Sequence, residues 1–314
     1  MSRRGPIVRR PATLADLPEV LALAQASDVV LIGESDWTEA DLREEWDEYD
    51  LGRDVFLLEL GGRLAGYAAF ERRGSSGRIL ADGYVHPELT GQGVGTELLR
   101  LTEARAREEV ASAPAGERVY LQNAALASDP AAPALFAAHG YEPVRRHWRM
   151  VIDLEGPPEP QVPPGIEVRL FQEPQERQVV HETIEEAFAD HWEHRRRSFE
   201  EWSRRAFDVE GYDPTLVWVA LEGDEVVAAN LGYWKRQGDW GWIGSIGVRP
   251  PWRRRGIAEA LLETSFAEFL RRGERRVGLG VDAESPTGAT RLYEKVGMRV
   301  FWEAVVYEKE LRAG

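Results

Sequence analysis

Hydrophobic and polar positions along the first half of the chain follow two periods, that of a strand and that of a helix. Apolar residues that favour strands fill 54–60 and 63–72, and Gly61-Gly62 between them is typical of a hairpin turn. After Gly93, apolar residues recur at helical spacing over roughly 15 positions. The pattern predicts strands at 6–10, 54–60, 63–72, 78–86, 117–123 and 147–154.

Polar residues and glycines mark the ends of the predicted helices. Thr13 is expected to cap a helix with Asp16 in its first turn, and a second helix begins near Thr38 and carries Trp46. Gly140 is expected to end a short helix. The second half has a capping box at Ser198 and Glu201, a hairpin turn at Glu222-Gly223-Asp224, and a final helix that ends at Gly297. This mixed order predicts an α/β fold with a partly antiparallel sheet.

The chain repeats itself at long range. The segment 91–99, Gly-Gln-Gly-Val-Gly-Thr-Glu-Leu-Leu, is echoed by Arg-Arg-Gly-Ile-Ala-Glu-Ala-Leu-Leu at 254–262. The segment 135–141 is echoed in the same order by 292–298. The spacing is far too long for a solenoid, so it indicates a duplicated domain. We therefore expect an N-terminal domain at 1–154, a proline-rich linker at 155–165 and a C-terminal domain at 166–314.

Composition narrows the classes of function. The chain has 39 basic and 54 acidic residues, a net charge of −15, which argues against nucleic acid or an anionic membrane as a partner. The same charge is compatible with a cationic amine, although solubility alone also explains it. The absence of cysteine excludes disulfides, cysteine-based metal sites and a cysteine nucleophile. Because no apolar stretch is long enough to span a membrane, we expect a cytoplasmic protein.

A glycine loop in the second half has the features of an anion site. A buried-type strand ends at Val248, Pro250-Pro251 delays the helix, and the helix begins at Gly256-Ile257. A helix N-terminus offers unpaired N–H groups and a positive dipole end, which suit a pyrophosphate. We call residues 253–258 the second glycine loop and 90–95 the first. Neither has the lysine of a triphosphatase loop, and neither has three glycines at the spacing and position of a dinucleotide fingerprint. A solvated basic turn is the alternative reading of the second loop.

The combination of motifs resembles the GNAT acyltransferase superfamily. Its elements are Arg253-x-x-Gly256-x-Ala258, the preceding Val248-Arg249-Pro250, and the later Leu292-Tyr293-x-x-x-Gly297. The tandem layout is similar to that of mycothiol synthase-like acetyltransferases. The resemblance implies a duplicated, mixed and mostly antiparallel sheet flanked by helices, with acetyl-CoA as co-substrate and no metal. It places the CoA contacts of the second half at Ile246, Gly247, Val248, Arg253, Arg254, Arg255, Gly256, Ile257, Ala258 and Ser285, and those of the first at Val85, Gln92, Gly93, Val94 and Gly95.

The two halves differ where the family resemblance assigns chemistry. The first half has Thr90 where the family places Arg or Gln, and Phe136 where the second half has Tyr293. A tyrosine at this position is expected to protonate the departing thiolate, which phenylalanine cannot do. We therefore expect a degenerate first domain and a catalytic second domain that transfers an acyl group directly to an amine. A pair of non-catalytic acyl-CoA-binding or sensing domains is the alternative.

The general base and the acceptor are less defined. The candidate bases are His191, Asp190, Glu185 and Asp282, and no spacing selects one; we assign the role to His191 and Asp190. Aromatic residues between 171 and 242 are expected to line an acceptor pocket or to belong to the core. The acceptor is a small-molecule or peptide amine, and the sequence leaves the oligomeric state open.

Overall fold

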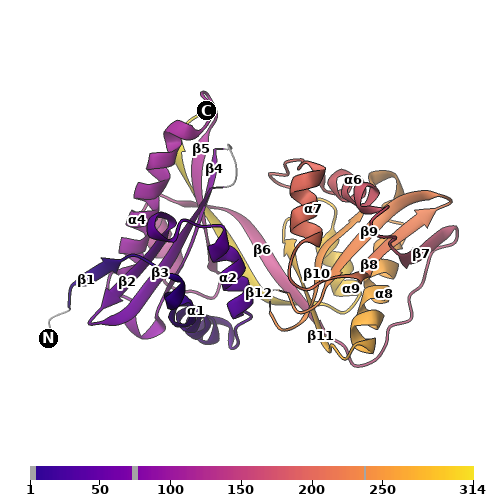
Figure 1. Cartoon of the computed structure of the whole chain (residues 1–314), viewed down its shortest axis with the longest axis horizontal. Helices are drawn as coiled ribbons and strands as arrows, with labels where there is room; N and C mark the ends of the chain where they lie inside the picture. The colour runs from indigo at the N-terminus through magenta and orange to yellow at the C-terminus, as the bar shows by residue number, and fades with distance from the viewer. Residues whose placement is uncertain (1–4, 73–76, 237) are drawn as a thin grey trace. The chain divides into compact units, whose positions relative to one another are not determined.

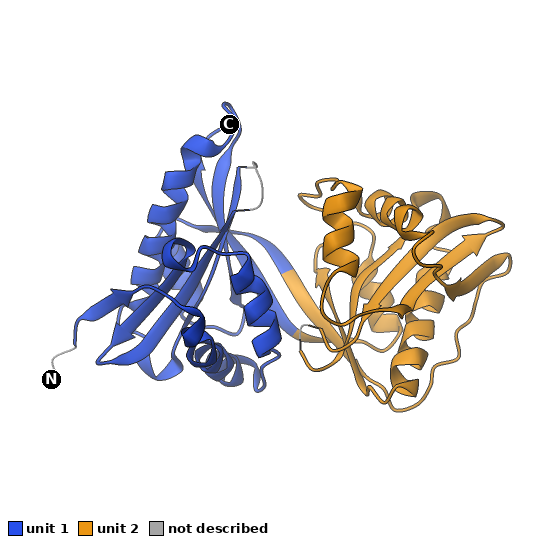
Figure 2. Ribbon diagram, in the orientation of Figure 1, with its two compact units in different colours: residues 1–146, 302–314 blue, residues 147–301 orange. Residues whose placement is uncertain are grey.

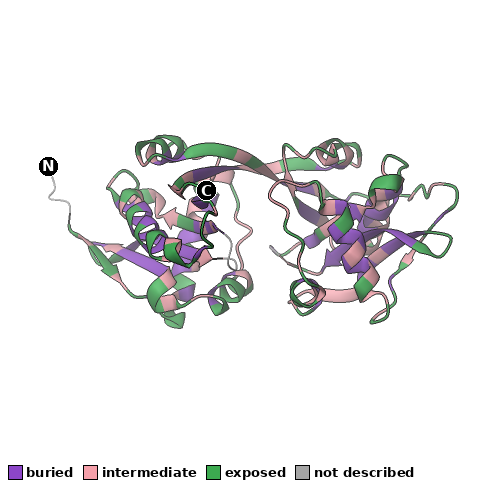
Figure 3. Cartoon of the chain, turned by 90° about the horizontal axis from the view of Figure 1, so that it is seen from above, coloured by how far each residue is buried: buried purple, intermediate pink, exposed green. Residues whose placement is uncertain are grey.

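The computed structural model of the chain describes residues 5–72, 77–236 and 238–314. The chain forms two compact units (Figure 2), unit 1 made of Met1–Arg146 and Trp302–Gly314, and unit 2 made of His147–Phe301. In each unit the buried positions follow the strands and the inner faces of the helices (Figure 3).

Unit 1 is a mixed sheet between helices, with strands in the order β1-β2-β3-β4-β5-β12. All neighbours are antiparallel except β4 and β5, which are parallel. Its elements (Figure 1) are β1 (Ile7–Arg10), η1 (Leu14–Asp16), α1 (Leu17–Ile32), α2 (Glu39–Asp47), α3 (Leu51–Asp54), β2 (Val55–Leu60), β3 (Arg63–Arg72), β4 (Arg78–Val85), η2 (Pro87–Leu89), α4 (Val94–Glu109), η3 (Val110–Ser112), β5 (Val119–Leu126), α5 (Ala132–Ala138) and β12 (Arg299–Arg312).

Strand alternation divides the core of unit 1 between the two faces of its sheet. Tyr67 and Ala69 of β3 pack with α1 and α2, where Trp46 is only 1% exposed. Ala68 and Phe70 of the same strand pack on the other face with α4 and α5. Because both faces are covered, β3 is buried along nearly its whole length.

Unit 2 repeats this plan with the strand order β6-β11-β10-β9-β8-β7. Here β10 and β11 are the parallel pair and the other described pairs are antiparallel. The elements are β6 (Glu142–Asp153), β7 (Ile166–Leu170), α6 (Arg177–Phe188), α7 (Phe199–Phe207), β8 (Tyr212–Glu222), β9 (Glu225–Tyr233), β10 (Gly241–Val248), η4 (Pro250–Trp252), α8 (Ile257–Arg271), β11 (Arg276–Asp282) and α9 (Ala289–Lys295). Helices α6 and α7 pack on one face of the sheet and α8 on the other. The predicted α/β class and mostly antiparallel mixed sheet are thus confirmed.

The predicted helix ends agree well with the structure. The Thr38 hydroxyl accepts from the Asp41 N–H over 3.1 Å, and Thr13 forms a capping box with Asp16. Ser198 caps α7 by accepting from the Glu201 N–H over 3.2 Å, whereas the reciprocal bond of a full capping box is not among the described contacts.

The last strand of each half of the sequence pairs with a strand of the other half. β6 pairs with β11 from Arg276↔Asp153 to Asp282↔His147, and β12 pairs with β5 from Ala304↔Leu126 to Arg312↔Val119. The predicted domains 1–154 and 166–314 leave β6 and β12 with the preceding half, so the unit boundaries differ from them. Strand period identifies which face of a strand is buried, but not which strand lies beside it.

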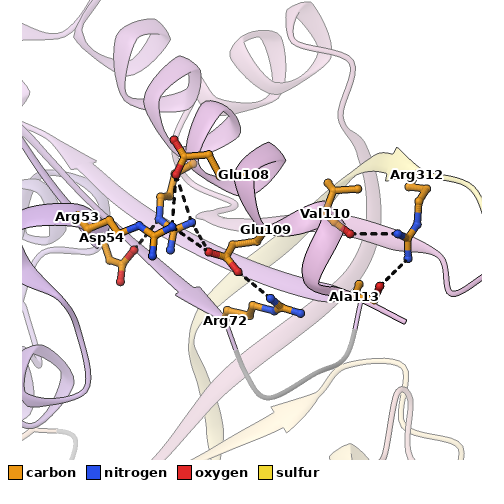
Figure 4. A network of polar contacts seen from close by, with 9 residues as sticks. Arg53, Asp54, Arg72, Glu108, Glu109, Val110, Ala113 and Arg312 are labelled. Carbon is orange, nitrogen blue, oxygen red and sulfur yellow. Dashed lines mark hydrogen bonds and ion pairs between the residues drawn. The ribbon is translucent and has the colours of Figure 1, made fainter. Parts of the chain in front are cut away.

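Polar contacts hold β12 in unit 1 (Figure 4). The Arg312 guanidinium donates to the carbonyl oxygen of Val110 over 3.0 Å, as Figure 4 shows. It also donates to those of Pro114 and Glu117 over 2.6 and 2.9 Å. These carbonyls lie in the segment between α4 and β5, so Arg312 joins the end of β12 to that connection. Nearby, Glu109 accepts from Arg72 over 2.7 Å.

No helix in the described part of the chain has the length and apolar character needed to cross a membrane. Within the same residues, no group of three or more His, Cys, Asp or Glu side chains is arranged to hold a metal ion.

Candidate active site

The parallel strands of unit 2 separate halfway along their length. Their described pairs run from Gly241↔Val277 to Ile243↔Leu279, although β10 continues to Val248. The register of β10 against β9 shifts between Ile243 and Ser245 at this point. The far end of β10, which contains Ile246, Gly247 and Val248, therefore pairs with β9 on one edge and has no strand partner among the described residues on the other. Such an edge offers backbone groups to a ligand.

The second glycine loop follows β10 directly. Gly256 is the N-cap of α8 and has a φ of 84°, in the left-handed region that glycine adopts without strain. No side chain caps this helix, so the N–H groups of its first turn point outward from Ile257 and Ala258 without a capping partner. The Ile257 side chain itself is buried in the core. Geometry and dipole together make this turn suitable for an anion.

The three arginines of the loop are unequally placed. Arg253 donates to Asp190 Oδ2 over 2.7 Å and to the Ala187 carbonyl over 2.9 Å. Arg255 donates to Glu222 over 2.7 Å. Arg254 is exposed, and the described part of the chain gives it no ion-pair partner. Two of the three expected pyrophosphate ligands are thus already paired with carboxylates.

Tyr293 lies on α9, which packs on β11, and is only 7% exposed. It belongs to the core cluster against which Ile246 of β10 and Val281 of β11 pack. Burial raises the pKa of its hydroxyl to about 12, so the group remains protonated at neutral pH. Ser285 lies in the turn ahead of α9, with its hydroxyl 2.9 Å from that of Thr287.

The candidate bases have different surroundings. The His191 ring packs against that of Phe188 with centroids 4.3 Å apart and the planes tilted by 41°, and burial lowers the pKa of His191. The hydrogen bond from Arg253 lowers the pKa of Asp190, which holds that carboxylate in an ion pair. Glu185 is buried and lies 3.2 Å from His194, while Asp282 accepts from the Glu284 N–H. His191 is therefore the better placed of the two assigned bases to accept a proton.

Most aromatic residues expected to line an acceptor pocket belong to the core or its margin. Trp202, Tyr233 and Trp242 are buried in the cluster beneath α6 and α7. Trp234 packs against the cluster that contains Tyr293. Trp192 lies beside His147, with ring centroids 6.2 Å apart.

Unit 1 has the same fork and contains a large cavity. The described pairs of β4 with β5 end at Ala81↔Asn123, and Gly93 caps α4 with a φ of 91°. The cavity has a volume of about 650 Å³, and every residue that lines it belongs to unit 1. Of the CoA contacts expected here, Val85, Gly93 and Gly95 line it, whereas Val94 is core and Gln92 is not a lining residue.

Phe136 also lines this cavity, at the position that Tyr293 takes in unit 2. Its ring stacks on Tyr307 of β12 with centroids 4.4 Å apart. Sequence reasoning missed this neighbour because β12 comes from the far end of the chain. It also missed Asp82, a cavity residue whose signal in the sequence is a carboxylate that directly follows the apolar run Ile79–Ala81 of β4.

Comparisons with known proteins agree with this geometry. The model of the acetyltransferase (GNAT) family matches residues 20–141 and 178–298. A mycothiol acetyltransferase of Geodermatophilus obscurus is 32% identical over 296 residues, covering 91% of each chain. The crystal structure of a GCN5-related N-acetyltransferase from Sphaerobacter thermophilus is 38% identical, with a TM-score of 0.89 over 99% of this chain and 98% of that one. A tandem GNAT protein from clavulanic acid biosynthesis, 13% identical, shares the fold with a TM-score of 0.73, over 98% of this chain and all of its own.

Proposed function

This chain belongs to the acetyltransferase (GNAT) family, and we propose that it transfers an acetyl group from acetyl-CoA to the amine of a small molecule, with the chemistry in unit 2. The observation that carries the assignment to unit 2 is the exchange of Phe136 for Tyr293 at equivalent positions. Phe136 lines the unit 1 cavity, so the same position in unit 2 faces the fork between β10 and β11. Only the tyrosine has a hydroxyl to donate.

In the proposed reaction the amine nitrogen attacks the thioester carbonyl carbon, a C–N bond forms, and the C–S bond breaks. Tyr293 donates a hydrogen bond to the sulfur as negative charge develops there. A phenol with a pKa of about 12 is a weak acid toward an ordinary thiolate. Burial also raises the pKa of a thiol, however, so both groups are shifted in the same direction and the donation remains productive.

The remaining site residues have separate proposed roles. His191 takes the proton released by the attacking amine, because its lowered pKa keeps it neutral near pH 7. The first turn of α8 and the exposed Arg254 hold the pyrophosphate, and the edge from Ile246 to Val248 pairs with the pantetheine arm. Asp190 positions Arg253 rather than transferring a proton. Unit 1 is proposed to bind acetyl-CoA at the first glycine loop without supplying an acid.

The names of the relatives suggest the first acceptor to test, an amine whose acetylation yields mycothiol. Turnover is measured as release of the CoA thiol, with this amine and a panel of other small amines.

Two matched variants test the division between the units. Asparagine tolerates the left-handed backbone, so Gly256→Asn and Gly93→Asn each add a side chain at a helix N-terminus with little strain. We expect Gly256→Asn to lower kcat/KM for acetyl-CoA by roughly tenfold or more, since the side chain obstructs the anion site. Gly93→Asn should change it by less than about twofold. Equal losses in two variants that both remain folded would contradict the assignment to unit 2.

A further inference from the structure

We propose that Glu185 is a positioning residue, whose buried carboxylate holds the connection between α6 and α7 so that His191 faces the fork between β10 and β11. The connection consists of residues 189–198. The link to acyl transfer rests on the proposed function, which makes His191 the proton acceptor. The anchor itself is a feature of the fold and can be measured without turnover.

The connection places His191 between the two strand ends of the fork. Phe188, the last residue of α6, packs over the far end of β10, where a Cβ added to Gly247 would lie 3.6 Å from its ring. The His191 ring packs against Phe188, and the His191 N–H donates to the Phe188 carbonyl oxygen over 2.9 Å. From the other strand, the carboxylate of Asp282 at the end of β11 is near enough to act on the pKa of His191. His191 therefore lies where the proposed reaction needs its base.

Glu185 binds the part of the connection that follows His191. The residue lies on α6 and is only 2% exposed. Its Oε2 accepts from the Arg197 N–H over 3.3 Å and lies 3.2 Å from the His194 Nε2. Its Oε1 lies 3.6 Å from the Arg197 Nε. Because a carboxylate at this depth is costly without polar partners, these contacts favour one position of the connection.

His181, one helical turn before Glu185, holds the same residue of the connection. Its Nε2 lies 3.1 Å from the Arg197 carbonyl oxygen. Its ring packs against those of Phe199 and Trp202 in α7, with centroids 5.7 and 5.2 Å apart. The backbone N–H and C=O of Arg197 thus both have partners on α6. The connection is fixed at its start by the helix that it leaves, and at its end by two side chains of that helix.

The backbone is strained between these fixed points. Glu193 has a φ of 52°, in the left-handed region that residues with a long side chain rarely adopt. Such a conformation persists only where the surrounding contacts determine it. The next residue, His194, is the one that contacts Glu185. Loss of the anchor should therefore let the connection relax, and His191 should move with it.

Unit 1 has a neutral version of the same anchor. When the N-cap residues of α2 and α7 are aligned, Gln25 takes the place of Glu185. Trp37 then takes the place of Arg197. The Gln25 Nε2 donates to the Trp37 carbonyl oxygen over 2.9 Å, at the same separation of 12 residues along the chain. The anchor is therefore common to both units, and it is a carboxylate in the unit whose connection carries the proposed base.

The pKa of His191 reports whether the ring keeps its place. Burial lowers this pKa. The charged groups that act on it come from the connection, the second glycine loop and β11, and they are Asp190, His194, Arg253 and Asp282. If the ring moves into water, the pKa should rise toward its ordinary value of 6.5. Loss of the Glu185 charge by itself would lower the pKa of His191, so a rise indicates displacement.

The experiment follows His191 in the full chain by NMR. The ring signals of the six histidines are assigned through single His→Gln substitutions. Leucine fills the space of a buried glutamate, and replacements of this kind often leave stability intact. In Glu185→Leu we expect the pKa of His191 to rise toward 6.5 and the proton contact between the His191 and Phe188 rings to be lost.

Two control variants separate the anchor from the charge. Glu182→Leu removes the same charge from the same helix, at a carboxylate that accepts from Gln178 near the surface, and should change neither signal. Glu185→Gln should keep His191 close to its wild-type position, because Gln25 makes this anchor with an amide. A displacement in Glu185→Gln as large as that in Glu185→Leu would overturn the hydrogen-bonded anchor.

His181→Phe tests the anchor from its second contact, and decides the matter should Glu185→Leu not fold. The variant keeps an aromatic ring against α7 and removes the bond to the Arg197 carbonyl. The change at His191 should have the same direction as in Glu185→Leu. An unmoved His191 in the folded variants, or an equal change in Glu182→Leu, would overturn the proposal.

Turnover then separates this proposal from the proposed function. Since a small displacement of a catalytic group is costly, kcat of Glu185→Leu should fall by about 10- to 10²-fold. The Kd for CoA should change by less than about twofold, because Arg253 keeps its bond to the Ala187 carbonyl. A displaced His191 with a wild-type kcat would support the anchor and refute His191 as the base. An unmoved His191 would refute the anchor whatever the rate.

Discussion

The Arg253 guanidinium donates to both carboxylate oxygens of Asp190, over 2.7 and 3.3 Å. It also donates to the carbonyl oxygen of Ala187 at the end of α6. These contacts join the second glycine loop to the helix that precedes it by more than sixty residues, and they neutralise one of the charges nearest the N-terminus of α8. The loop is therefore held in shape at the cost of part of its attraction for a phosphate.

We expect Asp190→Asn to strengthen the binding of CoA by unit 2. An asparagine oxygen retains one acceptor for Arg253, while the loss of a negative charge raises the local potential. The pair is partly exposed, so the expected gain is modest, about two- to fivefold in Kd. Calorimetric titration with CoA, in chains whose first loop carries Gly93→Asn, measures this affinity. Weaker binding would instead show that the intact pair is needed to shape the loop, and Asp224→Asn controls for net charge.

Local features of the fold were predictable because their causes are local. Thr38 caps its helix through a residue three positions on, and Gly256 turns the chain through its own φ. The partners of β6 and β12 lie more than a hundred residues away in the sequence, and the hydrophobic periodicity of a strand does not identify such partners. The same limit explains the cavity in unit 1. Its acids come from α1, the segment after α1, β4 and the segment after β5, and only the tertiary fold brings them together.

The contacts of Arg312 predict a stability difference between two arginines of the same strand. Arg312 donates to the carbonyls of Val110, Pro114 and Glu117 between α4 and β5, and Arg312→Ala removes these bonds. We expect the free energy of unfolding of unit 1 to fall by roughly 1–3 kcal/mol. Arg299→Ala removes only an exposed ion pair with Asp153 and should cost less than about 1 kcal/mol. Denaturant unfolding followed for each unit separately measures both values, and similar losses would contradict this account of β12.

The surroundings of His191 predict the acid side of the pH profile. Burial lowers its pKa below the ordinary value of 6.5, so the fraction of neutral imidazole falls only as the pH drops below that value. We expect kcat/KM to rise with pH through an apparent pKa below 6.5 and then to level off. In His191→Gln this rise of kcat/KM with pH should disappear, and the constant value of kcat/KM at higher pH should fall by about 10²–10⁴-fold. If the rise survives in the variant, another group is the base. His139→Gln in unit 1 is the control, since that residue lies outside unit 2.

Tyr293 predicts a loss of rate without a loss of binding. In Tyr293→Phe the ring still fills its place in the core, and only the hydroxyl is removed. We expect kcat to fall by about 10²-fold or more while the Kd for CoA changes little, because no phosphate contact is lost. Because the hydroxyl pKa is about 12, Tyr293 stays protonated over the range from about pH 6 to about pH 10. The wild-type rate should therefore not fall at the high end of this range through deprotonation of Tyr293.

Tyr233→Phe is the matched control for this experiment. Its hydroxyl, also in unit 2, has a pKa raised by burial to about 12 and donates to the Ala206 carbonyl over 3.1 Å. Loss of that bond should lower stability by roughly 1 kcal/mol and leave kcat intact. A purely structural Tyr293 would give the same result as Tyr233, with an altered melting temperature and an unchanged rate. A large kcat effect at Tyr293 alone would instead require its hydroxyl to act on the reacting sulfur, since the two rings are otherwise equivalent in burial and chemistry.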